Sequence, residues 1–501
     1  MSYSSINFMI FLIITLVLFY AVPKKLQWII LLLASIFFYC FSNYVLGIYL
    51  FITVFTTWGA AILIYKFNLG KKVTERSRES VIVYLFAVLL NFLIIATFKI
   101  SGLSLFVLNG IGINLTSLIL PIGLSFYTFQ TIGYLTDVFR YSTPPQKNFA
   151  KYFLFASFFP QILSGPIGRY DQLSPQFFVP KKYNADQFSM GAQRIIWGLF
   201  KKMVIADRTA IIVNEIFNNP TDYKGMYIVF AVMLFVIQLY ADFSGLIDIA
   251  TGAAQMFQIE LAINFNTPLF ARNISDFWSR WHMSLSSWFK DYLFYPLIKS
   301  DLFLNMKDFF KKIFGKKKSK NLTTYIGMFI LWFAIGCWHG VKGHFIIGAG
   351  LMFGIYIVGG KILAPVFNAI SKFLRIKKEK FIYKLFEVIR TFLLLSFAML
   401  FWRADSISTA FLMMKRAGIF IDGSLLNLGL DLNNFIVMWL SIGVLFIVDV
   451  IHYRKIKIRE NLIKQKIWIK WPIYIIAIMS ILLLGMYGPK YNASDFIYFK
   501  F

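Results

Sequence analysis

Residues 336–350 read GCWHGVKGHFIIGAG and place a histidine, His339, where an apolar run ends. The run TTYIGMFILWFAIGCW comes directly before it, and Gly336 and Gly340 lie on either side. An ionisable side chain inside a membrane is costly, so it is by default a candidate for function. The alternative is a structural histidine that is hydrogen-bonded to a neighbouring helix. The glycines would let a ligand or another backbone approach closely. The chemistry that a neutral imidazole offers at this point is proton transfer.

A second polar cluster, FWSRWHMSLSSWFKDYLFYPL at residues 277–297, contains His282, Arg280, Trp281 and Asp291. The segment is too polar for a lipid-facing span and too aromatic for an ordinary soluble loop. We therefore predict an interfacial or cavity-lining helix. Upstream, the stretch QLYADFSGLIDIA places Tyr240 and Asp242 in apolar surroundings. Asp242 indicates a cavity or an ion pair, for which the sequence offers three partners without choosing between them: Arg280, His282 and Lys290.

The composition is that of a membrane protein with many spans. Of the 501 residues, 58% are hydrophobic and only 15% are charged, which is too few to cover the surface of a soluble protein. The net charge of +28 would suggest nucleic acid in a soluble chain, but here it is better explained by basic loops held in the cytoplasm. The cysteines, Cys40 and Cys337, lie in apolar surroundings and fit no metal or disulfide pattern.

Apolar runs predict the elements that must position these residues. We expect transmembrane helices at residues 5–22, 27–43, 45–65, 81–99, 117–136, 226–250, 323–340, 345–363, 385–402, 432–451 and 472–487. Stretches broken by Gly and Pro are predicted to be re-entrant or partly immersed, at 152–167, 190–206 and 261–298. The first span lacks a basic leader and a cleavage site, so it is expected to be retained. Residues 1–501 show no linker or repeat and are predicted to form one domain.

Basic clusters predict the topology. Segments 66–80, 311–320, 372–384 and 454–470 all fall on one side of these spans, which should be the cytoplasmic side. His339 follows Thr323 by sixteen residues, or about 24 Å of helix, so the imidazole should lie deep in the bilayer.

In order and in combination, several stretches of this chain resemble the membrane-bound O-acyltransferase (MBOAT) family. Within the family, the chain is most similar to the bacterial branch of alginate O-acetylases and peptidoglycan O-acetyltransferases. The resemblance covers almost the whole chain and is carried by LPIGLSFYTFQTIGYLTDVFR (120–140), FFPQILSGPIGRY (158–170), GLFKKMVIAD (198–207), YADFSGLIDIA (240–250), NFNTPLFARNISDFWSRWHMSLSSWFKDYLFYPL (264–297), GCWHG (336–340), FWRADSISTA (401–410) and FIYFKF (496–501).

This resemblance implies an all-α fold, in which a ring of about eleven transmembrane helices and some re-entrant helices surrounds a tunnel to a buried histidine. It implies that His339 is the catalytic residue and His282 a second functional histidine. The supporting or tunnel-lining candidates are Trp338, Trp281, Asp242, Tyr240, Arg280 and Asp291. Acyl transfer to a hydroxyl needs a base, a role that suits His339. Cys337 as a nucleophile is less favoured, because residues two apart on a helix face different ways.

The resemblance also implies the partners. Acetyl-CoA is expected as the cytoplasmic donor, with no bound cofactor or metal, in the cytoplasmic (inner) membrane of a bacterium. An acetyltransferase or acceptor-presenting protein of the envelope is the expected partner, besides membrane lipids, and the acceptor is a polysaccharide. Peptidoglycan, alginate, cellulose and other exopolysaccharides all stay open as acceptors. The alternatives are a D-alanyl transferase for teichoic acids and, in another class, a transporter or flippase, which broken helices and intramembrane charges would also fit.

Overall fold

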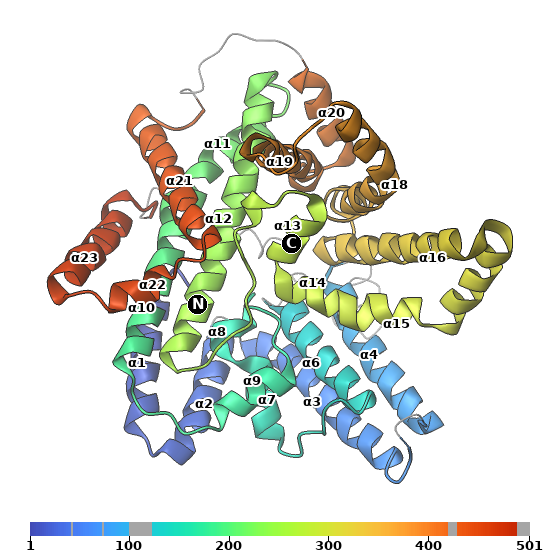
Figure 1. Ribbon diagram of the computed structural model, residues 1–501. Helices are drawn as coiled ribbons and strands as arrows, with labels where there is room; N and C mark the ends of the chain where they lie inside the picture. Colours follow the sequence, from blue (N-terminus) through green and yellow to red (C-terminus); the bar gives the residue numbers. More distant parts are fainter. Residues whose placement is uncertain (42–43, 73–74, 100–122, 419–427, 488–501) are drawn as a thin grey trace.

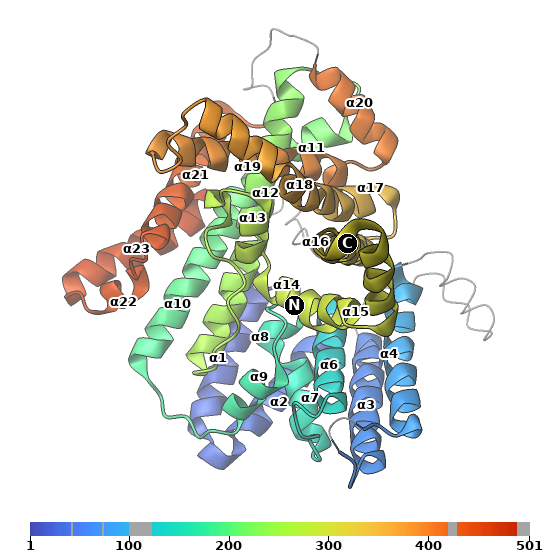
Figure 2. The same cartoon turned by 45° about the vertical axis from the view of Figure 1, so that its right-hand side comes forward.

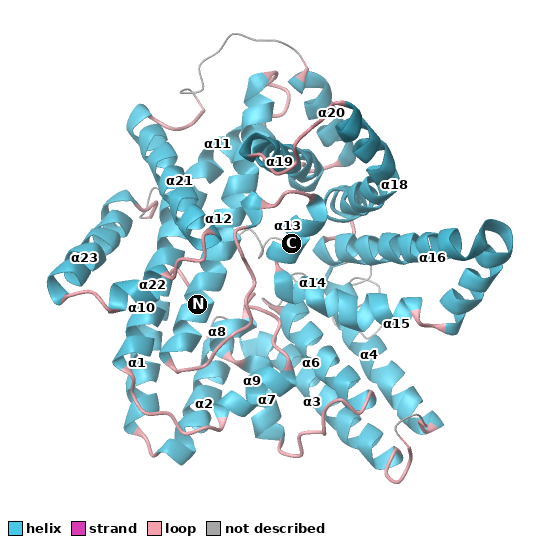
Figure 3. Cartoon of the chain, viewed as in Figure 1, coloured by secondary structure: helices cyan, strands magenta, loops and turns pink. Residues whose placement is uncertain are grey.

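The protein is built from helices. The computed structural model describes residues 1–41, 44–72, 75–99, 123–418 and 428–487, and every regular element in these ranges is a helix (Figures 1 and 3). The longer helices surround α13 (Ile274–Arg280) and α14 (Met283–Phe289), which lie near the centre of the view in Figure 1. The all-α class that the sequence predicts is therefore confirmed.

Eight helices in the described residues are long and apolar enough to cross a membrane, and each matches a predicted span. They are α3 (Tyr44–Phe67), α4 (Arg78–Lys99), α12 (Met226–Met256), α16 (Asp301–His339), the helix Gly343–Phe373 that contains α17 (Gly343–Phe345) and α18 (Met352–Phe373), α19 (Phe381–Arg403), α21 (Leu432–Tyr453) and α23 (Ile467–Leu484). In the apolar window of α12, 67% of the residues are buried, against 6% in α23. Hence α12 belongs to the interior and α23 to the periphery.

The other three predicted spans are short helices. α1 (Ile6–Ala21) and α6 (Leu124–Phe139) have 16 residues each, and α2 (Gln27–Cys40) has 14. At 1.5 Å per residue these lengths give about 21–24 Å, less than the ~30 Å of a hydrocarbon core. Residues 117–122 of the predicted span and the FIYFKF stretch lie outside the described residues.

Two of the three stretches predicted to be re-entrant do break into short helices. The first contains α7 (Phe149–Ser157) and α8 (Phe159–Ile162), and the third contains α13, α14 and α15 (Tyr295–Ile298). The stretch 190–206 is not broken as predicted, because α10 (Ala185–Leu199) continues through Phe200–Ala206 into α11 (Asp207–Asn218); its partial immersion stays a prediction. The remaining short helices are α9 (Tyr170–Phe177), α20 (Ile407–Ala417) and α22 (Ile458–Ile463).

The glycines of α10 do not break the helix; they let it pack closely against α12. A Cβ added to Gly198 would lie 2.6 Å from the carbonyl oxygen of Gly245, and one added to Gly245 would lie 2.8 Å from that of Gly198. Gly191 and Gly252 form a second reciprocal pair, at 2.6 Å in both directions. Cβ atoms do not approach oxygen this closely, so only glycine lets these two antiparallel backbones touch.

Among the described residues, three helical runs contain π-helical segments, at Phe200–Ala206, Lys290–Phe294 and Ile346–Leu351. Such segments are rare and occur frequently near functional sites. The first turns two consecutive side chains towards α12. Lys201 Nζ lies 2.6 Å from Asp248 Oδ2, and Lys202 Nζ lies 2.9 Å from Asp242 Oδ1.

α16 brings His339 to the centre after a reversal at Gly315, where φ is 77° and ψ is 167°. The Ser319 hydroxyl donates to the carbonyl oxygen of Lys307, so the part before Gly315 folds against the part after it. A positive φ of this kind favours glycine. In Figure 2, where α16 points towards the viewer, α3, α4 and α6 stand side by side below it.

Candidate functional site

Three aromatic rings form the candidate site. His282, Trp338 and His339, called the histidine cluster below, pack together, and the indole contacts both imidazoles. The ring centroid of Trp338 lies 5.9 Å from that of His282 and 4.5 Å from that of His339. His282 is fully buried and His339 is 5% exposed. The structure thus brings together both histidines that were predicted to be functional, and one of the predicted supporting residues.

Close helix packing positions His339, the last residue of α16. A Cβ added to Gly336 would lie 2.8 Å from the Cα of Ile346, in the third π-helical segment. A Cβ added to Gly340 would lie 2.3 Å from the ring of Phe345. The glycines were predicted to let either a ligand or another backbone approach closely. The structure shows the second use, because other parts of the chain pack against them. The ring of Trp402, on α19, lies 5.2 Å from that of His339.

His282 lies just before α14 in a left-handed backbone conformation, with φ 44° and ψ 51°. This conformation costs a residue other than glycine about 1–3 kcal/mol, and such strain is often found at functional sites. Asn264 holds this turn with two hydrogen bonds, one from its main chain and one from its side chain. The Asn264 carbonyl oxygen accepts the Met283 N–H at 3.1 Å, and the Asn264 side-chain oxygen accepts the Ser284 N–H at 3.1 Å.

The surroundings of His282 keep its imidazole neutral. The ring of Phe243 lies 4.8 Å from it in an edge contact, and the ring of Phe126 is nearly parallel to it at 6.1 Å. His282 is outside the eight candidate spans, and burial lowers its pKa to about 3. The ordinary pKa of histidine is near 6.5. Because the pKa is lowered, the ring is neutral at physiological pH and can donate one hydrogen bond and accept one.

A cation lies beside the cluster. Lys99, the last residue of α4, has its Nζ 5.6 Å from the centroid of the Trp338 ring and donates a hydrogen bond to the Trp338 carbonyl oxygen. A cation over an indole face gains about 0.5–2 kcal/mol, depending on how dry the site is. The ammonium also lies within electrostatic range of His339. Negative charge that develops at the cluster would therefore meet a positive group.

Two predicted residues, Trp281 and Tyr240, form the layer behind His282. The Trp281 ring lies 6.2 Å from Tyr240 and 6.1 Å from Phe243, which itself contacts His282. The Tyr240 hydroxyl donates to Asp449 Oδ1 at 3.1 Å, across to α21. Trp281 and Tyr240 therefore support the site indirectly, through the ring of Phe243.

The ion pair of Asp242 is not with any of the three partners considered from the sequence. Lys202 forms it, and the same ammonium lies 2.8 Å from Asp207. Arg280 instead pairs with Asp276 at 2.7 Å on its own helix. The sequence could not show this, because Lys202 reaches Asp242 only through the π-helical segment and the glycine contact of α10 with α12.

Asp291 belongs to a different polar cluster. This cluster includes Asp137, which lies about three turns along α6 from Phe126. Arg169 forms an ion pair with Asp291 and donates to the Tyr292 hydroxyl at 3.2 Å. The Tyr292 hydroxyl donates to Asp137 Oδ2 at 2.7 Å. Burial raises the pKa of Asp137, although the hydrogen bond from Tyr292 and the charge of Arg169 act to lower it. One face of α6 therefore leads from the histidine cluster to this group, around a small cavity.

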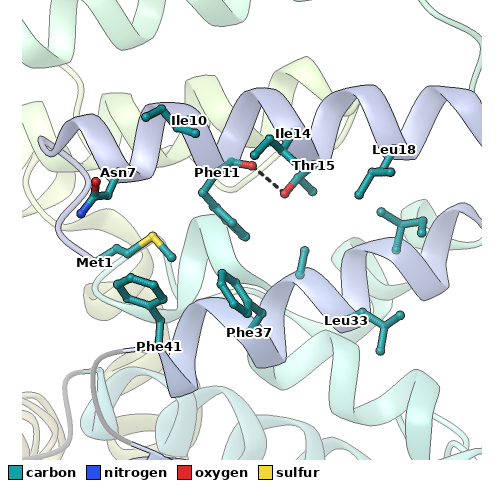
Figure 4. Close-up of a pocket in the computed structure, with 12 residues that line it drawn as sticks. Met1, Asn7, Ile10, Phe11, Ile14, Thr15, Leu18, Leu33, Phe37 and Phe41 are labelled. Carbon is teal, nitrogen blue, oxygen red and sulfur yellow. Dashed lines mark hydrogen bonds between the residues drawn. The ribbon is translucent and has the colours of Figure 1, made fainter.

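An apolar groove that lies elsewhere is not a candidate active site. It has a volume of about 500 Å³ and runs between α1 and α2 (Figure 4). Its lining is apolar except for Asn7 and Thr15, and the Thr15 hydroxyl is already bonded to the Phe11 carbonyl oxygen at 2.8 Å. In the described part of the chain, no three His, Cys, Asp or Glu side chains gather so that they could hold a metal ion.

Sequence reasoning missed Asn264, Lys99 and Trp402. Asn264 and Trp402 lie in two of the stretches that carry the family resemblance, but no role was inferred for either. Lys99 ends an apolar run, where a lysine is ordinarily explained by its reach to the membrane surface. Only the folded arrangement, in which α4 packs against α3 and α6, places it beside Trp338.

The chain belongs to the membrane-bound O-acyltransferase family. The family model matches residues 139–401, more than half of the chain, and this range includes both histidines of the cluster. The protein is therefore an O-acyltransferase and a multi-pass membrane protein, which decides the enzyme-or-transporter alternative in favour of the enzyme.

Relatives with known names agree with this assignment. The probable alginate O-acetylase AlgI of Pseudomonas syringae is 29% identical, over 81% of this chain and 73% of its own. The peptidoglycan O-acetyltransferase of Helicobacter pylori is 31% identical, over 77% of this chain and 72% of its own. The teichoic acid D-alanyltransferase of Bacillus subtilis is 31% identical over 48% of this chain and 58% of its own.

Proposed function

We propose that the protein transfers an acetyl group from cytoplasmic acetyl-CoA to a hydroxyl group of an envelope polysaccharide, of the peptidoglycan or alginate type. The observation that carries this proposal is the pair of buried imidazoles that both contact Trp338. The choice of acetyl rests on the relatives. Those named for O-acetylation align with 69–85% of the chain, whereas the D-alanyltransferase of Bacillus subtilis aligns with 48%.

In the proposed reaction His339 is the general base. It takes the proton of the acceptor hydroxyl as the oxygen attacks the thioester carbonyl. The new C–O bond forms, the C–S bond breaks, and the proton passes to the leaving thiolate. General-base help of this kind contributes about 10²–10⁴-fold, and a thioester is already activated towards attack.

The developing oxyanion needs a donor or a positive charge nearby. Two groups at the cluster could provide it, the indole N–H of Trp338 and the ammonium of Lys99, which lies over the same indole. Trp281 was the other indole considered from the sequence. It packs against Tyr240 and Phe243 in the layer behind His282, so we do not give it this role.

The proposed direction is from the cytoplasm outwards, across the cytoplasmic membrane of a bacterium. Basic residues on the cytoplasmic side would attract the phosphates of acetyl-CoA. On the outer side, an envelope protein would receive the acetyl group or present the polysaccharide. The single domain of residues 1–501 supplies the path between them.

A transfer assay in sealed membrane vesicles tests this proposal. With labelled acetyl-CoA on the cytoplasmic face, label should reach the polysaccharide on the other face. His339→Ala should abolish transfer, and His282→Ala should impair it less completely. His344→Ala should retain most activity, since His344 lies against the backbone of Phe401 and Trp402. His452→Ala, on an exposed side chain at the end of α21, is the control.

All variants should be compared at equal membrane abundance, because a misfolded variant imitates a catalytic loss. Near wild-type transfer by His339→Ala would show that the histidine is structural. Label that arrives only when acetyl-CoA is on the outer face would show that the direction is wrong. Labelling by a D-alanyl thioester and not by acetyl-CoA would favour the teichoic acid alternative.

A further inference from the structure

The side-chain oxygen of Asn264 receives three hydrogen bonds in the turn that carries His282. The Ser284 N–H reaches it at 3.1 Å, the Ser284 hydroxyl at 2.8 Å, and Nδ1 of His282 lies 3.3 Å from it. Asn264 is 2% exposed and His282 is fully buried, so water does not compete for these bonds. The Asn264 side chain is therefore the polar anchor of the His282 imidazole.

The direction of these bonds follows from the groups that make them. A backbone N–H can only donate, so the atom that faces the Ser284 N–H must be the amide oxygen and not the amide nitrogen. The Ser284 hydroxyl oxygen accepts the Ile167 N–H at 3.0 Å, which leaves its own hydrogen for Asn264. An amide oxygen only accepts. Hence the nitrogen of His282 that faces it must carry the hydrogen.

We propose that Asn264 is a positioning residue that holds neutral His282 as the Nδ1–H tautomer and leaves Nε2 as its proton-accepting nitrogen. A neutral imidazole has one donor and one acceptor, and the hydrogen bond made by one nitrogen fixes the state of the other. The clamp also fixes the orientation of the ring, since Asn264 bonds to the backbone of both Met283 and Ser284.

This tautomer limits what His282 can do in the proposed reaction. The effect of Asn264 on the rate rests on that proposed function. A ring whose Nδ1–H is given to Asn264 has no hydrogen on Nε2 to donate to an oxyanion. It can instead accept a hydrogen bond from a substrate group that carries one, such as the acceptor hydroxyl or an amide N–H of the thioester donor. His282 thus orients a proton-bearing group, while proton removal stays with His339.

Nitrogen NMR tests the tautomer without any activity. The chain has four histidines, so uniform labelling of histidine with ¹⁵N gives few signals, and His282→Gln identifies those of His282. In the wild-type protein in lipid nanodiscs, His282 should show a protonated Nδ1 and an unprotonated Nε2. Asn264→Leu should abolish this preference, and Asn264→Asp, which keeps an oxygen acceptor, should preserve it. Asn266→Ala is the matched control, since Asn266 is exposed two positions along the same loop.

The rate supplies a second, separate readout. Asn264→Leu should lower kcat by about 10²-fold with a smaller change in KM, and Asn264→Asp should restore most of the loss. A protonated Nε2 in the wild-type protein would overturn the proposal, and so would an unchanged tautomer in folded Asn264→Leu protein. If Asn264→Leu does not fold, the wild-type spectrum still decides. A correct tautomer together with full activity of His282→Gln and His339→Ala would instead refute the proposed function.

Discussion

At the scale of single residues, the indole of Trp338 organises the site. Its ring contacts both imidazoles and has Lys99 over it, so one side chain touches three ionisable groups. Lys99 is the one among them that the sequence did not indicate. Its place at the C-terminus of α4 also suits a cation, because the helix dipole is negative there.

Lys99→Met tests whether that cation acts in the reaction. The methionine keeps the apolar stem but removes the positive charge beside the cluster. If the ammonium stabilises the oxyanion, kcat should fall by about 10²–10³-fold with little change in the abundance of folded protein. Lys25→Met, at an exposed position, is the control and should be silent. An unaltered kcat in Lys99→Met would confine Lys99 to packing against Trp338.

At the scale of elements, the contact between α10 and α12 depends on the absence of side chains. Gly198→Leu would drive a side chain into the backbone of α12, because even its Cβ would lie 2.6 Å from the Gly245 carbonyl oxygen. We expect this variant to lose most of its folded protein, measured by size-exclusion chromatography and thermal melting in detergent. Gly359→Ala, on α18, should be tolerated, since an added Cβ there meets nothing within 4 Å. A well-folded Gly198→Leu protein would contradict this contact.

The buried ion pairs beside this contact make a second prediction. Lys202 serves both Asp242 and Asp207, and its side chain is 3% exposed. Lys202→Met leaves two carboxylates without this partner, and removal of one member of a buried pair costs about 3–5 kcal/mol. The midpoint of thermal unfolding should therefore drop sharply, whereas Lys24→Met, at an exposed site, should leave it unchanged. A small shift in Lys202→Met would mean that the carboxylates are neutral or hydrated.

The elements and the site differ in how far the sequence predicts them. Long apolar runs predicted α12 and α19 closely, because membrane thickness fixes the length of a span. The pairing of Asp242 with Lys202 could not be predicted, because it depends on the helix type of one short segment. His339 and His282 were predicted through their sequence stretches. Their common contact with Trp338 was not, since it requires the fold to bring the turn at His282 to the end of α16.

At the scale of the whole molecule, charge predicts the topology. Segments 66–80, 311–320, 372–384 and 454–470 should all face the cytoplasm. Single cysteines placed in each segment, in a background without Cys40 and Cys337, should resist a membrane-impermeant thiol reagent in intact cells and react in inverted vesicles. Labelling of any one segment from outside would break the predicted alternation of the spans.

The π-helical segment Phe200–Ala206 has a consequence for how this chain can change in length. A π-helix holds one more residue than an α-helix along the same path, so removing one residue would restore regular hydrogen bonds at little local cost. The flanking helices α10 and α11 would keep their facing, but consecutive side chains inside the segment would then point about 100° apart, as in a regular α-helix. Lys201 and Lys202 could then no longer face Asp248 and Asp242 together. In a scan of single-residue deletions, a deletion in this segment should therefore lower the midpoint of thermal unfolding through the lost ion pairs, while α10 and α11 keep their contacts with α12.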